Sequence, residues 1–291
     1  MIRIDIGIAR GKEQCGEWWD GVFTELIRVA QTNPDIEIGK ISTAGSAMKD
    51  VSKNMAAGKL LGQVNTAENR TAIINGLMAE DNPGEAIFWI DDDTIPPKGA
   101  LEALIALEAD IAAGVYYLRN PPYHPVAYKK HPDHAGYTPL WDFRKGEVRP
   151  VDSVGMGCTL VRRYVYEEIL KQYVLFSRAA THTLKAVHKD DILETRTLPA
   201  KVRKHMGKVL VSEQGAVLLE GLDPVPAVER FPFYVMEFER TEDHYFCEMA
   251  RRCGFNIMLD TMIECEHWGW KKVTGEHFRK MREQWLAQQK G

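Results

Sequence analysis

The feature that most constrains this chain is the stretch IFWIDDDTIPP at residues 87–97, where four apolar residues run directly into three aspartates and a turn with two prolines. The apolar run predicts a buried strand, and the prolines predict a turn immediately after the acidic residues. Such a strand delivers its carboxylates to the C-terminal edge of a sheet, where open α/β sheets bind their ligands. Because adjacent carboxylates repel one another, the cluster is either a solvated acidic turn or part of a site for a divalent cation.

The segments before this stretch predict an α/β fold. Two apolar strands, at residues 3–8 and 36–43, flank a segment at 17–30 whose apolar residues have helical spacing. Asn65 followed by Glu68 resembles a capping box, which predicts that a helix opens there and leads into the acidic strand. Alternating strands and helices are typical of a mixed, mostly parallel sheet flanked by helices.

Two glycines and one arginine each have a plain and a functional explanation. Gly155 and Gly157 interrupt a strand-like segment at 151–161, which indicates either a bulge or a close approach of the backbone to another group. Arg70 lies near the start of the helix that precedes the acidic strand. It forms either a surface ion pair with a neighbouring acid such as Glu68 or a contact with a phosphate, and the pattern alone leaves both open.

Two later motifs also have a plain structural explanation beside a functional one. Glu242 and Asp243 begin a predicted helix that ends at Gly254, and acids in a first turn are favourable for the helix dipole alone. His267 ends a strand predicted at 262–267, where a single histidine is more often structural than a ligand.

Composition narrows the class of protein. The 291 residues are 45% hydrophobic and 27% charged, which is ordinary for a globular protein that buries a substantial core. The net charge of −4 gives no general attraction to nucleic acid or to anionic membranes. The five cysteines show no CxxC spacing, there is no signal-peptide pattern, and no apolar run approaches the roughly 18 residues of a membrane span. We therefore expect a cytoplasmic protein with reduced thiols and no transmembrane segment.

In combination these motifs resemble the GT-A glycosyltransferases, most closely their inverting, family-two-like group. The order is an acidic cluster after a hydrophobic strand, a glycine-broken strand, an acidic pair opening a helix, and a late histidine. The resemblance is strongest in three segments, residues 65–117, 151–163 and 231–268. It implies a Rossmann-like GT-A catalytic domain over residues 1–270 with an acceptor-side insertion at 171–230, followed by a helical tail at 271–291.

In that family the acidic cluster is the DxD motif. The resemblance implies that Asp93 coordinates Mn²⁺ or Mg²⁺ at the diphosphate of the donor, with His267 as a further ligand through its neutral imidazole. Asp91 is a second candidate metal ligand, and Asp91 or Asp92 would contact ribose or sugar hydroxyls. The chemical need is clear, because a bound cation stabilises the charge that develops on the leaving diphosphate.

The same resemblance implies the remaining roles. The other donor-binding candidates are Arg10, Arg70, Gly155 and Gly157. Asp243 would be the general base for the acceptor hydroxyl, with Glu242 supporting the site or substituting in that role. A base is needed because a hydroxyl is a poor nucleophile until its proton is removed. Direct attack opposite the leaving diphosphate would invert the anomeric centre.

Substrates stay open at this level. The donor would be a UDP- or GDP-sugar, and the acceptor a glycan, a lipid-linked sugar, a protein or a modified DNA base, the last favoured by a basic stretch at 196–208. A sugar-phosphate nucleotidyltransferase is an alternative, for which GIARGK near the N-terminus would be the phosphate loop. A catalytically silent module that binds nucleotide-sugars or carbohydrate is another.

Overall fold

The acidic stretch forms strand β3 (Ala86–Asp91), as the apolar run predicted, and its side chains alternate between two hydrophobic cores. Ile87 and Trp89 lie in one core, whereas Phe88 and Ile90 lie in the other. This alternation follows from the two-residue period of a strand. β3 is therefore buried on both faces, as expected of an interior strand in a sheet covered by helices.

The computed structural model describes residues 1–10, 16–45, 61–132, 136–178, 183–188, 209–211, 217–219, 231–237, 240–269 and 272–289. Its central sheet has seven strands in the order β2-β1-β3-β10-β5-β15-β8. The other six are β1 (Ile2–Arg10), β2 (Ile36–Gly45), β5 (Ile111–Val115), β8 (Val148–Pro150), β10 (Cys158–Arg162) and β15 (Ile257–Glu264). β10 and β8 run antiparallel to their neighbours, whereas β1 pairs in parallel with β2 and β3, and β5 with β15. The predicted α/β class with a mixed, mostly parallel sheet is confirmed.

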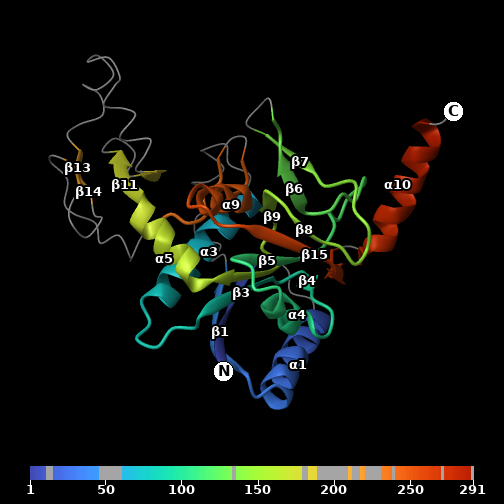
Figure 1. Ribbon diagram of the computed structural model, residues 1–291, viewed down its shortest axis with the longest axis horizontal. Coiled ribbons are helices and arrows are strands. Elements are labelled where there is room, and N and C mark those ends of the chain that lie inside the picture. The colour runs from blue at the N-terminus through green and yellow to red at the C-terminus, as the bar shows by residue number, and fades with distance from the viewer. Residues whose placement is uncertain are drawn as a thin grey trace.

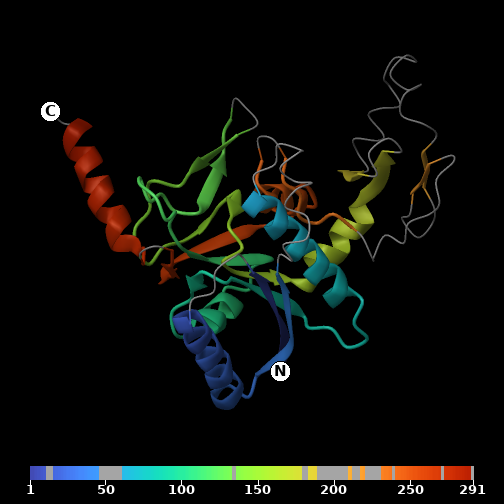
Figure 2. The same ribbon diagram turned by 180° about the vertical axis from the view of Figure 1, so that it is seen from behind.

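Helices cover both faces of this sheet (Figures 1 and 2). One core packs α1 (Gly16–Thr32) and α4 (Ala100–Ala106) against the face that lies lower in Figure 1. The other core packs α3 (Leu61–Met78), α5 (Arg163–Gln172) and α9 (Glu242–Arg252) against the upper face. The buried residues of α1 have the helical spacing noted in the sequence and are Trp18, Val22, Leu26 and Val29.

Helix α3 corrects one sequence prediction. The helix already includes Leu61, so Asn65 lies inside it and is not its N-cap. The prediction of a capping box at Asn65 and Glu68 was therefore wrong. Its three-residue spacing also occurs within a helix, where residues three apart share a face, and the pattern does not distinguish the two.

The glycine-broken segment is two strands that belong to different sheets. β9 (Ser153–Val154) pairs with β6 (Ala127–Lys130) in a three-stranded sheet that also contains β7 (Tyr137–Pro139). β10, which follows, lies in the central sheet. The turn at residues 155–157 is where the chain crosses from one sheet to the other.

The strand predicted at residues 262–267 is also divided. β15 begins at Ile257, and its register with β5 shifts between Asp260 and Glu264. The chain resumes after Cys265 as β16 (Glu266–His267), which pairs antiparallel with β4 (Thr94–Ile95) just after the acidic cluster. This pairing brings His267 to the acidic turn.

The proposed insertion at 171–230 is described only in part. β11 (Tyr173–Arg178) pairs with β12 (Thr183–His188), and β13 (Val209–Val211) pairs with β14 (Val217–Leu219). The basic stretch at 196–208 lies outside the described residues.

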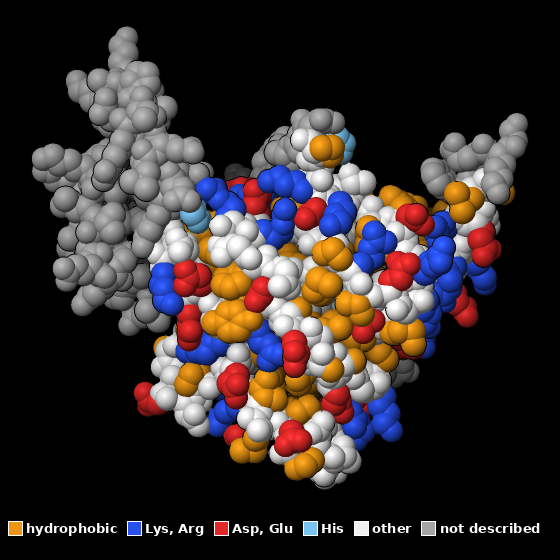
Figure 3. All heavy atoms as spheres, in the orientation of Figure 1, with side chains coloured by type: hydrophobic (Ala, Val, Ile, Leu, Met, Phe, Trp, Pro, Cys, Tyr) orange, Lys and Arg blue, Asp and Glu red, His pale blue; other side chains and the backbone are white. Residues whose placement is uncertain are grey.

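The C-terminal helix α10 (Gly275–Gln289) extends outward from the rest of the fold (Figures 1 and 2). Phe278, only 2% exposed, attaches it to the main core. Within the described ranges no helix has the length and apolar character needed to cross a membrane. Positive and negative side chains are intermixed over the described part of the face in Figure 3.

Gly155 generates a stability prediction. A Cβ atom there would overlap the hydroxyl oxygen of Tyr116 and lie 2.6 Å from a methyl group of Val126. We expect Gly155→Ala to lower the free energy of unfolding by about 1–3 kcal/mol, the usual cost of overpacking. Gly76→Ala is the control, because a Cβ at this helical position meets nothing within 4 Å. It should raise stability by about 0.5–1 kcal/mol. Urea unfolding measures both, and equal responses would contradict the prediction.

Candidate active site

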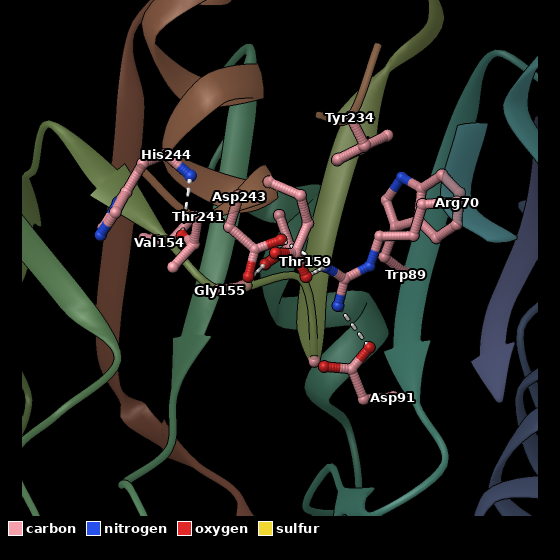
Figure 4. A network of polar contacts seen from close by, with 12 residues as sticks. Arg70, Trp89, Asp91, Val154, Gly155, Thr159, Tyr234, Thr241, Asp243 and His244 are labelled. Atoms are coloured by element: carbon pink, nitrogen blue, oxygen red, sulfur yellow. Dashed lines mark hydrogen bonds and ion pairs between the residues drawn. The ribbon is translucent and has the colours of Figure 1, made fainter. Parts of the chain in front are cut away.

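A buried arginine joins three carboxylates at the C-terminal edge of the sheet. Arg70 comes from α3, and its side chain is only 2% exposed. Its Nη2 donates to Oδ1 of Asp91 at 2.6 Å. Its Nη1 donates to Oε1 of Glu242 at 3.0 Å and to Oδ1 of Asp243. Figure 4 shows the guanidinium between Asp91 and Asp243. Three segments far apart in the sequence thus meet at one cation.

The position of the acidic pair has a local cause. Thr241 is the N-cap of α9, and its side chain accepts a hydrogen bond from the backbone N–H of His244 at 3.4 Å. The unpaired N–H groups and the dipole of a helix favour acids in its first turn. The dipole explains why acids stand here, but it does not explain why the Glu242 and Asp243 side chains are only 9% and 17% exposed. Their burial against Arg70 sets them apart from ordinary first-turn acids.

Two carboxylates of this cluster, Asp243 and Glu242, hold a proton more tightly than exposed acids do. Burial raises the pKa of Asp243 well above its usual value; Arg70 opposes this effect, and the negative charges of Glu242 and Asp91 add to it. Burial likewise raises the pKa of Glu242 against the opposing effect of Arg70. One guanidinium does not neutralise three carboxylates. Asp243 is therefore a stronger proton acceptor than an ordinary aspartate.

The acidic turn is fixed in place by its backbone. The indole Nε1 of Trp18, in α1, donates to the carbonyl oxygens of Asp91 and Thr94, both at 2.8 Å. The N–H of Asp91 donates to the carbonyl oxygen of Gly157 at 3.3 Å. Asp92 is itself buried, with 6% exposure. The turn is consequently a defined structural element, and the solvated acidic turn considered from the sequence is wrong.

A second polar group lies at the far side of the turn. Nδ1 of His267 lies 2.6 Å from the carbonyl oxygen of Tyr117, and because a carbonyl only accepts, Nδ1 carries the hydrogen. Nε2 lies 3.3 Å from Oδ2 of Asp93, and Nη1 of Arg119 lies 3.0 Å from the same oxygen. Burial favours a higher pKa for Asp93, but the hydrogen bond from His267 and the charge of Arg119 outweigh it and lower that pKa. Asp93 is therefore an ionised carboxylate next to an imidazole.

The Asp93 and His267 pair fits a divalent cation. A neutral imidazole with its hydrogen on Nδ1 has a free Nε2 lone pair for metal, so a divalent cation could take the place of the proton that Nε2 donates to Asp93. Histidines that bind metals commonly donate their other N–H to a carbonyl, as His267 does. In the described part of the chain no three His, Cys, Asp or Glu side chains are grouped to hold a metal by themselves. Mg²⁺-type sites usually combine one or two protein ligands with water and substrate phosphates.

The other predicted site residues occupy varied positions. Arg70 is buried among carboxylates, so the surface ion pair with Glu68 is wrong, and its contact with a donor phosphate stays a prediction. Asp91, predicted as a metal ligand, accepts a hydrogen bond from Arg70, and its role toward metal also stays a prediction. Arg10 ends β1 at the same edge of the sheet, but its side chain lies outside what the structure describes.

The two glycines pack against a tyrosine. The backbone N–H of Gly157 donates to the hydroxyl of Tyr116 at 3.3 Å, and a Cβ at Gly157 would lie 2.9 Å from the Tyr116 ring. The close backbone approach inferred from the sequence is thus made to Tyr116, as it also is at Gly155. Contact of either glycine with a donor sugar stays a prediction.

Three residues of the site were missed from the sequence. Arg119 follows the β5 strand in a proline-rich loop, and nothing in its neighbours indicates a role. Trp18 has the spacing of a core residue, which gives no sign that its indole N–H holds the acidic turn. Tyr116 follows directly after β5, and its neighbours in the sequence give no sign that it contacts both glycines.

No protein-family model matches this chain, and no curated protein matches its sequence. Similar solved structures include A197 from STIV, with 15% identity, coverage of 78% of this chain and 97% of that chain, and a TM-score of 0.34. They also include GalNAc-T7 with UDP, GalNAc and Mn²⁺, with 10% identity, coverage of 97% of this chain and 48% of that chain, and a TM-score of 0.43. This chain thus spans about half of the GalNAc-T7 chain. At these TM-scores, function has to be inferred from the side chains themselves.

The Arg70 cluster generates the second prediction. Arg70→Met leaves three buried carboxylates without their cation, so we expect the free energy of unfolding at pH 7 to fall by about 3–5 kcal/mol. The loss should shrink at pH 5, where the raised pKa values of Asp243 and Glu242 allow these two acids to be protonated. Lys171→Met is the control, because Lys171 is 70% exposed in its pair with Glu168 and should change stability little. A loss independent of pH would contradict this account.

Proposed function

We propose that this protein is a metal-dependent glycosyltransferase of the GT-A type, which transfers a hexose from a nucleotide-diphosphate donor to an acceptor hydroxyl with inversion. The observation that supports this is the meeting of the acidic turn after β3 with the acidic pair of α9 through Arg70. The meeting point is the C-terminal edge of the sheet, where α/β folds bind ligands.

In the proposed reaction Asp243 is the general base. Its carboxylate takes the proton of the acceptor hydroxyl while the acceptor oxygen bonds to the anomeric carbon. The bond from that carbon to the diphosphate oxygen breaks, and the nucleoside diphosphate leaves as an anion. The raised pKa of Asp243 suits a base that works near neutral pH. Arg70 positions this carboxylate, and Glu242 shares the guanidinium with it.

The donor would bind on the other side of the acidic turn. Asp93 and His267 would hold Mn²⁺ or Mg²⁺, and when bound the cation would stabilise the negative charge of the diphosphate. Arg119, half-exposed beside Asp93, is a second positive group suited to phosphate oxygens. Asp91, whose side chain is 21% exposed, and Asp92 are the residues that we assign to ribose or sugar hydroxyls.

The two alternatives make different products. A sugar-phosphate nucleotidyltransferase would release pyrophosphate, whereas the proposed enzyme releases nucleoside diphosphate. A silent binding module would bind the donor without turnover. Product analysis with UDP- and GDP-sugars and a panel of acceptors therefore separates all three.

The base assignment generates a kinetic prediction. Asp243→Asn should lower the transfer rate about 10²- to 10⁴-fold, the usual contribution of a general base, while donor affinity stays near that of the wild type. The wild-type rate should fall as pH drops through a pKa above that of an ordinary aspartate, because the base must be unprotonated to accept a proton. Asp260→Asn, also buried but bonded to the N–H of Met262, is the control. Undiminished transfer by Asp243→Asn would refute the assignment.

The metal assignment has its own test. Asp93→Asn and His267→Ala should each weaken Mn²⁺ binding, measured by calorimetry with UDP or GDP present, by about 10- to 100-fold or more. His277→Ala is the control, because this half-buried histidine interacts with Thr274 and Tyr123. Unchanged Mn²⁺ affinity in both site variants, with His277→Ala also unchanged, would exclude this metal site.

A further inference from the structure

A row of aromatic rings runs outward from the catalytic end of α9. Each ring contacts the next one in space. We call this set the aromatic row, and its members are Tyr137, His244, Tyr128, His124 and Trp141. Tyr137 stacks on His244, with ring centroids 4.2 Å apart and planes 6° apart. Tyr128 meets His244 edge to face at 4.6 Å, and His124 contacts Tyr128 at 6.0 Å and Trp141 at 5.8 Å.

The aromatic row begins beside the proposed base and ends at the surface. His244 is the next residue after Asp243, and the Asp243 charge adds to burial in raising the pKa of Tyr128. Trp141 at the other end is 37% exposed, and the intervening rings are partly exposed. In both ribbon views β6 and β7, which carry Tyr128 and Tyr137, lie between α9 and α10 (Figures 1 and 2). An extended ligand on the row would thus have one end near Asp243.

The aromatic row and its surroundings are close to electrically neutral. Burial, aided by the charge of Arg240, lowers the pKa of His244 to about 4, so its ring is uncharged at neutral pH. Four cations on or beside these elements pair with three acids: Lys130 and Arg240 with Glu248, Lys129 and Arg251 with Asp152, and Arg240 also with Glu237. Binding a nucleic acid would require a larger excess of positive charge than the single one that these four cations and three acids leave.

We propose that the aromatic row is the platform for the acceptor, and that the acceptor is a neutral oligosaccharide. This inference rests on the proposed glycosyltransferase function, because it uses Asp243 as the reference point for the reacting hydroxyl. Sugar rings present C–H faces that pack on aromatic rings, and their hydroxyls bond to the polar ends of tyrosine and histidine. Of the acceptor classes open from the sequence, a glycan matches this uncharged row best, and a DNA base matches it least.

The test measures binding of saccharides to the full chain without donor or metal. Saturation-transfer NMR and calorimetry would use maltohexaose, cellohexaose, mannohexaose and chitohexaose, with the oligonucleotide (dT)12 as the competing class. Trp141→Ala should weaken binding of the best saccharide about tenfold, and Trp141→Phe, which keeps a ring, should weaken it less. Tyr164→Ala is the matched control, because this tyrosine is 45% exposed and contacts Phe255 outside the row. Tyr137→Leu tests the inner end of the row, and melting temperatures establish that each variant is folded.

The outcomes separate the two proposals. Saccharide binding that Trp141→Ala weakens and Tyr164→Ala does not would support the platform, even if no sugar transfer were found and the glycosyltransferase proposal failed. Three outcomes would overturn the proposal that the aromatic row binds the acceptor. None of the four saccharides binds, or the Trp141 and Tyr164 variants have equal effects, or the protein prefers (dT)12. Sugar transfer measured alongside such a result would leave the glycosyltransferase proposal standing.

Discussion

The buried guanidinium of Arg70 is the interaction on which the rest of the site depends. A charge removed from water is tolerated when it is paired and hydrogen-bonded, and Arg70 is paired through Nη1 and Nη2 with acids from two other elements, although its buried Nε has no hydrogen-bond partner among the described residues. The segment at 231–237 lies across α3, where Thr71 and Tyr234 exchange hydrogen bonds and the Tyr234 ring lies 5.9 Å from the guanidinium. α3, the end of β3 and the start of α9 are therefore held in one arrangement, because moving any of them would leave a charge buried without its partner.

Arg70 does not neutralise all three carboxylates of this cluster. With every group ionised, the cluster would hold two more negative charges than positive ones. Burial is the main cause of the raised pKa of Asp243 and Glu242, and the negative charge of the neighbouring acids adds to it. Arg70 itself opposes this effect, and in the proposed mechanism it would hold the Asp243 carboxylate in place as that carboxylate accepts a proton.

The sequence predicted what depends on local pattern and missed what depends on contacts across the chain. β3, its turn and α1 follow from apolar spacing and prolines within a few residues. The division of residues 151–161 between two sheets could not be predicted from the sequence. The two glycines are needed there because Tyr116, which lies far away in the sequence, packs against them. Arg70 pairs with Glu242, which is 172 residues further along the chain, and no local sequence pattern indicates such a contact. The association of Asp93 with His267 came from a family resemblance, and its geometry came only from the pairing of β16 with β4.

The acidic turn separates two carboxylates whose environments act in opposite directions. At Asp93 the imidazole of His267 and the charge of Arg119 outweigh burial and favour the ionised form, which is the form that binds a cation. At Asp243 burial and two neighbouring acids outweigh Arg70 and favour the protonated form. Pairs of acids with such divergent pKa values commonly divide the work of a reaction between them. In the proposed reaction this division would place charge stabilisation at the Asp93 side and proton transfer at the Asp243 side, with the backbone held by Trp18 between them. A substrate that spans the turn would then have its leaving group and its nucleophile on opposite sides, as direct displacement requires.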